Sequence, residues 1–139
     1  ADTMFIASAS ARPLATGAAD GLDMSHRGGR PGFVELRDDD DGTELILPDY
    51  DGNRLFNTLG NLLANPRAGL LFIDYRRGDL LQLRATARID AERAATDVSP
   101  GIQRQTRLTI LSGWFRPDAL ALQWTAPRYA RELALDQDH

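Results

Sequence analysis

The chain has 139 residues, no cysteine, two histidines and a formal net charge of −4. Its length fits one domain with one hydrophobic core, so we treat residues 1–139 as a single unit. Without cysteine there are no disulfides, thiolate metal sites, iron–sulfur ligands or cysteine nucleophile, and two histidines leave little for a histidine-based metal site. The negative charge disfavours a nucleic-acid interface, which needs a basic surface.

The hydrophobic segments are all short. None approaches the about 18 apolar residues of a membrane-spanning helix, and the first residues lack the charged and hydrophobic regions of a signal peptide. We therefore expect a cytoplasmic protein that does not enter a membrane.

The first half of the chain contains three strand patterns. Residues 3–9 are a short apolar run that predicts a first strand, and residues 15–20 form the following turn. Residues 33–37 and 43–47 read as two strands of a hairpin, because aspartates followed by Gly42 join them. We expect the aspartates to form a solvated tip; a calcium site there would lack the spaced ligands and closing glutamate of known calcium loops.

Residues 25–32, SHRGGRPG, combine three glycines with two arginines and a mid-chain imidazole. Glycines let a backbone approach a ligand closely, and arginine supplies a fixed positive charge. The segment is either a charged turn between two strands or part of a binding site.

An amphipathic helix is predicted at about residues 52–64. Asp51 suits the N-cap position, and Pro66 ends the run because the residue before a proline leaves the α region. The buried face is formed by apolar residues at helical spacing, namely Leu55, Phe56, Leu59, Leu62 and Leu63.

The opposite face of this helix is rich in hydrogen-bond donors. Together with the free N–H groups and positive dipole of the helix start, these donors suit an anion; the alternative is an ordinary solvated face. Gly60 favours the site, because a mid-helix glycine costs about 1 kcal/mol relative to alanine and suggests that a backbone or a ligand comes close. The donors are Asn53, Arg54, Asn57, Thr58 and Asn61.

The second half of the chain again predicts strands. Residues 68–74 are continuously apolar and suggest a central strand covered on both faces, and residues 80–89 alternate as a longer strand. In it, Gln82 either faces solvent or lines a pocket. Residues 105–111 are a further strand, and Gly113 to Pro117 a turn.

The sequence pattern is less regular towards the end of the chain. Residues 120–124 suggest a last strand, residues 90–101 a loop or short helix, and the tail from Pro127 a short helix or irregular chain. Six or seven strands joined by hairpins, with one helix, predict a mostly β protein, a small antiparallel barrel.

Three motifs in this order resemble a known family. SHRGGRPGF at 25–33, PDYDGNRLFNTLGNLLANPRAGLLFID at 48–74 and GDLLQL at 78–83 closely resemble the pyridoxamine 5′-phosphate oxidase-like family of FMN-binding split β-barrels, in particular its bacterial branch. The resemblance implies a homodimer with FMN at the subunit interface.

The same resemblance implies that arginine and small polar residues hold the FMN phosphate, which agrees with the donors found above. Trp124 resembles an aromatic residue that reaches the partner's site in such proteins. No catalytic side chain and no metal ligand is assigned. The cofactor-binding residues carried over are His26, Arg27, Gly28, Asn53, Arg54, Asn57, Thr58, Asn61 and Gln82.

The sequence also departs from the family. Ala85 stands where the family commonly has a glycine, and the C-terminal substrate-binding signature of true pyridoxamine 5′-phosphate oxidases is absent, so oxidation of that vitamer is not implied. We expect an FMN-dependent oxidoreductase acting on a small-molecule substrate or electron donor. The alternatives are a non-catalytic flavin storage or sensing module and a deazaflavin-binding reductase; heme is disfavoured for want of an axial ligand.

Overall fold

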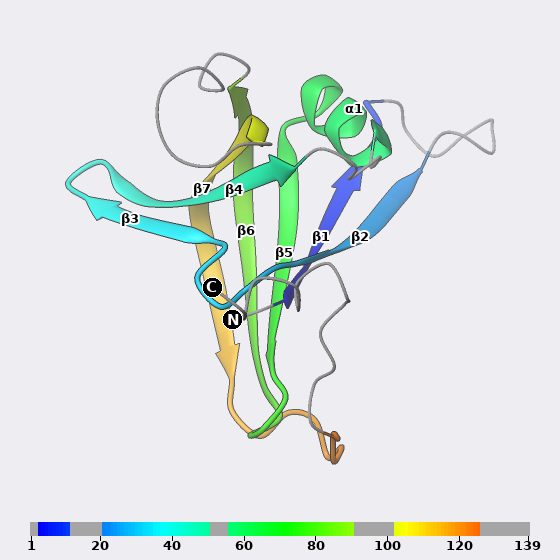
Figure 1. Ribbon diagram of the computed structural model, residues 1–139, viewed down its shortest axis with the longest axis vertical. Helices are drawn as coiled ribbons and strands as arrows, with labels where there is room; N and C mark the ends of the chain where they lie inside the picture. Colours follow the sequence, from blue (N-terminus) through cyan, green and yellow to red (C-terminus); the bar gives the residue numbers. More distant parts are fainter. Residues whose placement is uncertain (1–2, 12–20, 51–55, 91–101, 126–139) are drawn as a thin grey trace, which may run out of the picture.

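The structure, a computed structural model, describes residues 3–11, 21–50, 56–90 and 102–125. These residues form one antiparallel sheet of seven strands in the order β2-β1-β5-β6-β7-β4-β3, together with one helix (Figure 1). The elements are β1 (Thr3–Ala9), β2 (Leu22–Gly28), β3 (Glu35–Asp39), β4 (Gly42–Tyr50), α1 (Phe56–Ala64), β5 (Arg67–Asp74), β6 (Asp79–Asp90) and β7 (Ile102–Arg116).

The predicted mostly β, antiparallel fold is confirmed. β1 has the predicted bounds because its side chains alternate strictly between buried and half-buried. The hairpin of β3 and β4 forms at the aspartate tip, where Asp39 pairs with Gly42 and Asp38 accepts a hydrogen bond of 2.7 Å from the Thr43 hydroxyl. β4 pairs with the first half of β7, and in Figure 1 the hairpin runs across the view while β6 and the rest of β7 run along the long axis.

The two faces of the sheet differ. We call inner the face that carries Met4, Ile6, Leu70 and Leu108, all buried in one hydrophobic cluster, and outer the opposite face. Leu62 of α1 joins this cluster, so the helix covers the inner face near β1, β2 and β6. At nine residues α1 is too short and polar to cross a membrane, and it is the one helix in the described part of the chain.

The described residues cover β5 fully on its inner face and only partly on its outer face. Ala68 and Leu70 on its inner face are buried, whereas Gly69 and Leu71 on its outer face are only half-buried. The described helix packs on the inner face alone, which leaves the outer side chains to their neighbours on adjacent strands.

Three further segments differ from the prediction. Residues 25–28 of the predicted loop belong to β2, and β7 continues through Gly113 where a turn was expected. Gly113 serves close packing: a Cβ there would lie 2.6 Å from Leu83 Cδ2 on the paired strand. Residues 120–124 are not a strand; Leu120 instead donates its backbone N–H to the Gly78 carbonyl.

Some expectations concern parts of the chain outside the described residues. These are the turn at 15–20, the first turn of the predicted helix at 52–55, the segment 91–101 and the tail from 127.

Candidate functional site

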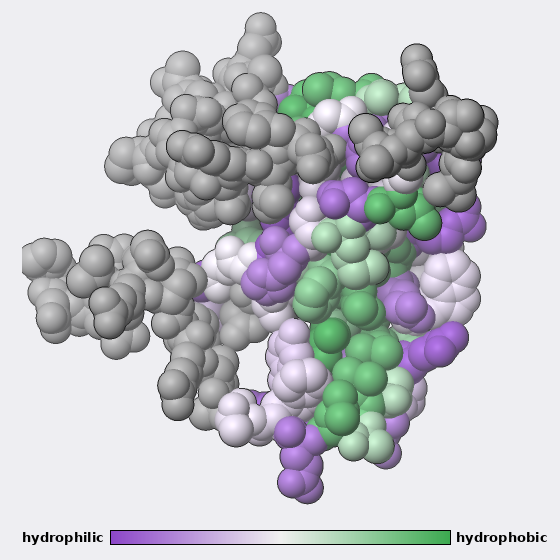
Figure 2. Space-filling view, turned by 90° about the vertical axis from the view of Figure 1, so that its right-hand side faces the viewer, coloured by the Kyte–Doolittle hydropathy of each residue, from purple (hydrophilic) through white to green (hydrophobic). Residues whose placement is uncertain are grey.

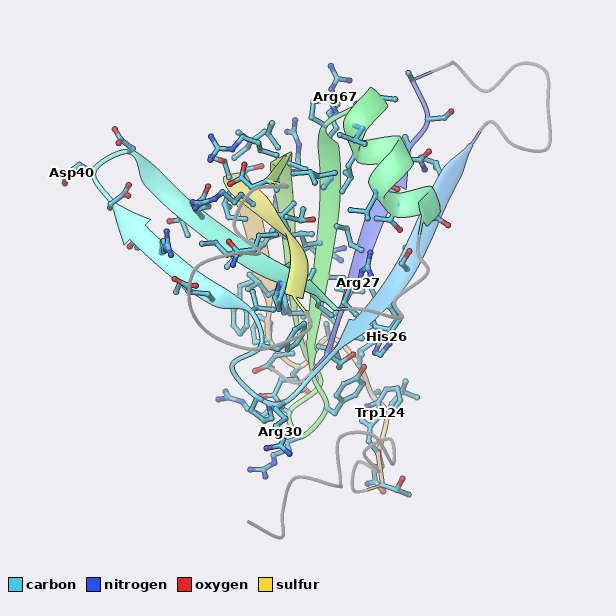
Figure 3. The ribbon with its side chains drawn as sticks, turned by 45° about the horizontal axis from the view of Figure 1, so that its top comes forward. His26, Arg27, Arg30, Asp40, Arg67 and Trp124 are labelled. Atoms are coloured by element: carbon cyan, nitrogen blue, oxygen red, sulfur yellow. The ribbon has the colours of Figure 1, made fainter. Side chains whose placement is uncertain are left out.

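The motif SHRGG divides between the two faces of β2. Successive strand residues point to opposite faces, so Arg27, paired with fully buried Met4, lies on the inner face and His26, paired with Phe5, on the outer face (Figure 3). The His26 ring packs edge-to-face on the Phe5 ring at a centroid distance of 5.4 Å, and its Nε2 contacts the Thr3 hydroxyl. His26 and Arg27 therefore cannot contact the same small ligand within one chain.

Arg27 and Gly28 line a cavity together with Thr58 of α1. β2 and α1 are separated by two strands along the chain, yet the fold brings their polar residues to one place. The cavity volume is about 20 Å³, room for about one water molecule, so only one end of a nucleotide-sized ligand would enter. Its other walls are mainly apolar, formed by Ile6, Phe33, Leu47, Pro48, Leu59, Leu62 and Thr106.

A buried polar cluster joins α1 to β2 at the edge of this cavity. The Thr58 hydroxyl lies 2.5 Å from the Ser25 hydroxyl, and both lie within hydrogen-bond distance of Asp23 Oδ2, at 3.1 and 3.2 Å. Two hydroxyl protons serve these three contacts. Thr58 is 1% exposed, so its hydroxyl holds the helix in place and has no spare proton for a phosphate.

Sequence reasoning missed Asp23 and Ser25. The signal was the alternation of β2, which places residues 23, 25 and 27 on one face. It was overlooked because the segment was interpreted as a loop.

Asn61 also serves to attach the helix. Its side-chain amide donates to the Ser8 hydroxyl on β1 over 3.2 Å, and Ser8 is 3% exposed. Asn61 is not part of the cavity lining. Like Thr58, this predicted ligand contact fixes the position of α1.

The remaining predicted residues lie elsewhere. Gln82 is exposed on the outer face of β6, where Leu71 of β5 and Trp114 of β7 are its neighbours. Asn53 and Arg54 lie outside the described residues, and so does the side chain of Asn57. The structure thus brings together three of the nine predicted residues, Arg27, Gly28 and Thr58.

Three other sequence features have a structural explanation. A Cβ at Gly60 would meet nothing within 4 Å, so no described backbone approaches the helix there, and the approach of a ligand stays a prediction. Ala85, in place of the family glycine, is 2% exposed and belongs to the core cluster. Trp124 packs edge-to-face on Tyr75 at 4.8 Å and remains 46% exposed.

The fold and the cavity define a small antiparallel β protein with an arginine-lined cavity beside its helix. The sequence model of the pyridoxamine 5′-phosphate oxidase family matches residues 3–116. The chain belongs to this family. No curated protein sequence matches it.

Solved structures show the same fold. Two crystal structures of HupZ from group A Streptococcus, one of a single-substitution variant, have TM-scores of 0.58 and 0.57 at 15% and 14% identity. The alignments cover 83% and 82% of this chain and 90% and 84% of theirs. HutZ, the heme storage protein from Vibrio cholerae, has a TM-score of 0.47 at 10% identity, with 81% of this chain and 84% of HutZ covered. At these identities the likeness to the two HupZ structures concerns the fold alone.

Proposed function

We propose that this protein is an FMN-binding flavoprotein, an oxidoreductase in which the bound flavin passes a hydride or electrons between small molecules. Membership of the family supports this proposal. The observation that carries it is the meeting of Arg27 and Gly28 with α1 at one cavity.

The residues present suit the phosphate end of FMN. A guanidinium can form two parallel hydrogen bonds to phosphate oxygens, and Gly28 has no side chain to keep a phosphate from its backbone. With room for about one water molecule, the cavity does not take in a whole phosphate, so the phosphate would lie against Arg27 and Gly28 at the cavity edge with the rest of the cofactor outside. The mainly apolar walls lower the local dielectric, which strengthens the attraction between Arg27 and an anion.

FMN, when bound, supplies the hydride or electron transfer. The chain's own contribution is to bind and orient it. Arg27 would hold the phosphate, and the cluster of Asp23, Ser25 and Thr58 would keep α1 at a fixed distance from β2.

We also propose that the protein is a homodimer with the flavin at the subunit interface. His26 and Gln82 lie on the outer face, in a row with half-buried Phe5 and Leu71 and half-exposed Trp114. Figure 2, which looks from the side of β1 and β2, shows hydrophobic side chains gathered in a strip bordered by polar ones. An apolar sheet face of this kind favours association, and a second subunit would let one flavin reach both Arg27 and the outer row.

Binding of FMN and of riboflavin, which lacks the phosphate, tests the role of Arg27. Arg27→Gln should weaken FMN binding about tenfold or more, as expected for loss of a charge-assisted contact, and leave riboflavin binding nearly unchanged. Arg76→Gln, at an exposed arginine in the turn after β5, is the control. Equal FMN affinity in the three proteins would refute the assignment.

The oligomeric state tests the interface. Met24, on the outer face of β2, is 67% exposed, and Leu36, on β3 outside this face, is 64% exposed. Met24→Glu should shift the dimer towards monomer in sedimentation equilibrium, because it places a charge in an apolar contact, whereas Leu36→Glu should not. A monomeric parent protein, or a Met24→Glu dimer as tight as the parent, would remove the interface from the proposal.

Turnover with a reduced nicotinamide donor tests the catalytic part separately. A flavin that binds tightly but is not reduced by any such donor would favour a storage or sensing module. A released cofactor with the mass of a deazaflavin would change the cofactor and keep the binding site.

A further inference from the structure

The outer face also carries a group of donors that the proposed flavin site does not use. Arg84 on β6 pairs with Gly69 on β5 and with Ser112 on β7, and Arg67 lies two residues before Gly69 on the same face. Thr86 pairs with both Arg67 and Thr109. We call this group the outer donor patch; its members are Arg67, Arg84, Thr86, Thr109 and Ser112.

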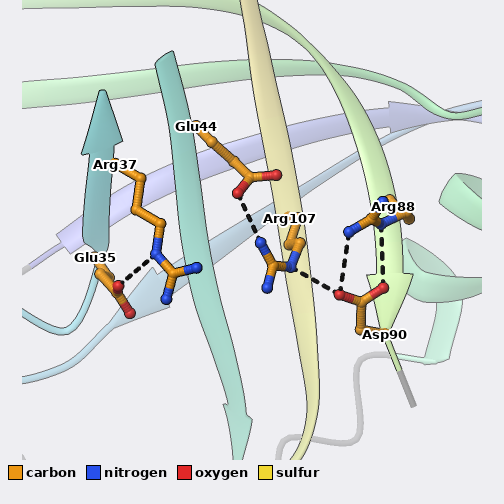
Figure 4. Close-up of polar contacts among 6 residues, drawn as sticks. All are labelled: Glu35, Arg37, Glu44, Arg88, Asp90 and Arg107. Carbon is orange, nitrogen blue, oxygen red and sulfur yellow. Dashed lines mark hydrogen bonds and ion pairs between the residues drawn. The ribbon is translucent and has the colours of Figure 1, made fainter. Parts of the chain in front are cut away.

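The patch has no acidic member, and the nearest carboxylates are already engaged. Arg107 binds Glu44 Oε2 at 2.8 Å and Asp90 Oδ2 at 2.7 Å, while Arg88 binds the second oxygen of Asp90 at 3.1 Å (Figure 4). These pairs lie on β4, β6 and β7 directly beside the patch. Arg67 and Arg84, both exposed, have side chains that make no hydrogen bond or ion pair with any other residue the structure describes.

Two cations in these positions repel one another. Arg67 and Arg84 are diagonal neighbours on adjacent strands, a separation of about 7–8 Å that long side chains readily span. An anion between them would convert the repulsion into two charge-assisted contacts. In the part of the chain described, no such anion is supplied by the protein itself.

The floor of the patch is open. Above Gly69 the one atom within 4 Å of an added Cβ is Ala7 Cβ, at 3.6 Å, so no larger side chain fills this place. A glycine inside a strand often marks a close approach of a ligand. On the other side of Arg84, on β7, Ser112 Oγ is buried and has no hydrogen-bond partner among the described residues, although a buried hydroxyl normally has one.

We propose that the outer donor patch binds a phosphate group, either as free phosphate or as part of a small molecule. Guanidinium and hydroxyl donors from three adjacent strands can serve several oxygens at once, which suits phosphate better than a carboxylate with two oxygens. Phosphate at Arg84 also gives the Ser112 hydroxyl an acceptor close by. This site lies on the opposite face of the sheet from Arg27 and does not depend on flavin binding.

Thermal unfolding with increasing inorganic phosphate, at constant ionic strength, tests this site. A ligand of the folded state raises the midpoint in proportion to its affinity. The double variant Arg67→Gln/Arg84→Gln should bind phosphate at least about tenfold more weakly. Arg76→Gln is the control. Phosphate also stabilises proteins in general as an excluded salt, and this effect is the same in the double variant and in Arg76→Gln.

The comparison with other variants separates the two anion sites. Arg27→Gln should keep the phosphate-dependent rise, and the double variant should keep its riboflavin affinity. If the double variant loses FMN affinity as well as phosphate affinity, the patch takes the phosphate of a flavin; if it loses phosphate alone, the ligand is a different phosphate compound. Both results support the site.

Two results would overturn it. The first is that the unfolding midpoint of the parent protein rises no more with phosphate than with another salt that is excluded from protein surfaces to the same extent. The second is that phosphate raises the midpoint of the double variant as much as that of Arg76→Gln. Because both arginines are exposed, the double variant should fold, and a cooperative transition in chloride with a midpoint no lower than that of the parent verifies this.

Discussion

Replacing Thr58 with valine should show how strongly the polar cluster fixes α1 beside the cavity. The substitution keeps the shape of a side chain that is 1% exposed and removes one hydroxyl. That hydroxyl contacts Ser25 at 2.5 Å and Asp23 at 3.1 Å. Ser25 keeps its own contact of 3.2 Å with Asp23, so no buried group is left without a partner.

The expected loss follows from these contacts. One neutral hydrogen bond contributes about 1 kcal/mol and one to a carboxylate about 1.5–3 kcal/mol, with the lower end appropriate because Asp23 is only half-buried. We therefore expect the free energy of unfolding to fall by about 2 kcal/mol. For a chain of this length the midpoint falls by about 3–4 °C per kcal/mol, which gives about 6–8 °C.

Urea unfolding measures the free energy, and an unchanged m-value verifies that the unfolded state is the same. A double-mutant cycle with Ser25→Ala isolates the contact between the two hydroxyls, with an expected coupling of about 1 kcal/mol. A loss below about 0.5 kcal/mol for Thr58→Val, or a coupling near zero, would show that the cluster does not hold the helix.

Two glycines give further predictions. Gly60→Ala should raise the free energy of unfolding by about 1 kcal/mol, since a Cβ there meets nothing within 4 Å. A lower midpoint of thermal unfolding in this variant would contradict the prediction. Gly78→Ala should lower the free energy of unfolding by about 2 kcal/mol or more, because φ is 73° and the added Cβ would clash with the Leu120 carbonyl oxygen. Gly32→Ala is the matched control, because Gly32 has a φ of 96° and open space around it, so this variant measures the cost of the backbone conformation alone. An equal loss of unfolding free energy in both variants would show that the contact with Leu120 does not matter.

Much of the fold could be predicted from local patterns. Both β1 and the aspartate hairpin depend on neighbours in sequence. β1 formed with the expected bounds, and the hairpin formed with its turn in the aspartate run, although its first strand spans Glu35–Asp39 and not residues 33–37. The error at Gly113 has a nonlocal cause: this glycine makes room for Leu83 on the paired strand, 30 residues earlier. A glycine followed a few residues later by a proline occurs both in turns and in strands with such a contact. Only knowledge of the strand pairing distinguishes the two cases.

The candidate site was predictable in part. The residue types of Arg27 and Thr58 indicated their region, and the structure places both at one cavity. The interpretation of residues 25–32 as a loop concealed that His26 and Arg27 point to opposite faces. The roles of Thr58 and Asn61 depend on their contacts with Ser25 on β2 and Ser8 on β1. These serines lie near the helix only because of the way the strands are ordered in the sheet, which the sequence pattern does not reveal.

The identity of the cofactor in the purified protein tests the central claim most directly. The absorbance spectrum of freshly purified protein, followed by mass analysis of the released small molecule, should show an oxidised flavin with the mass of FMN. The Arg27→Gln variant, purified in the same way, should retain less of it. Parent protein that is colourless and takes up no added FMN, or that releases a different chromophore, would contradict the proposed function.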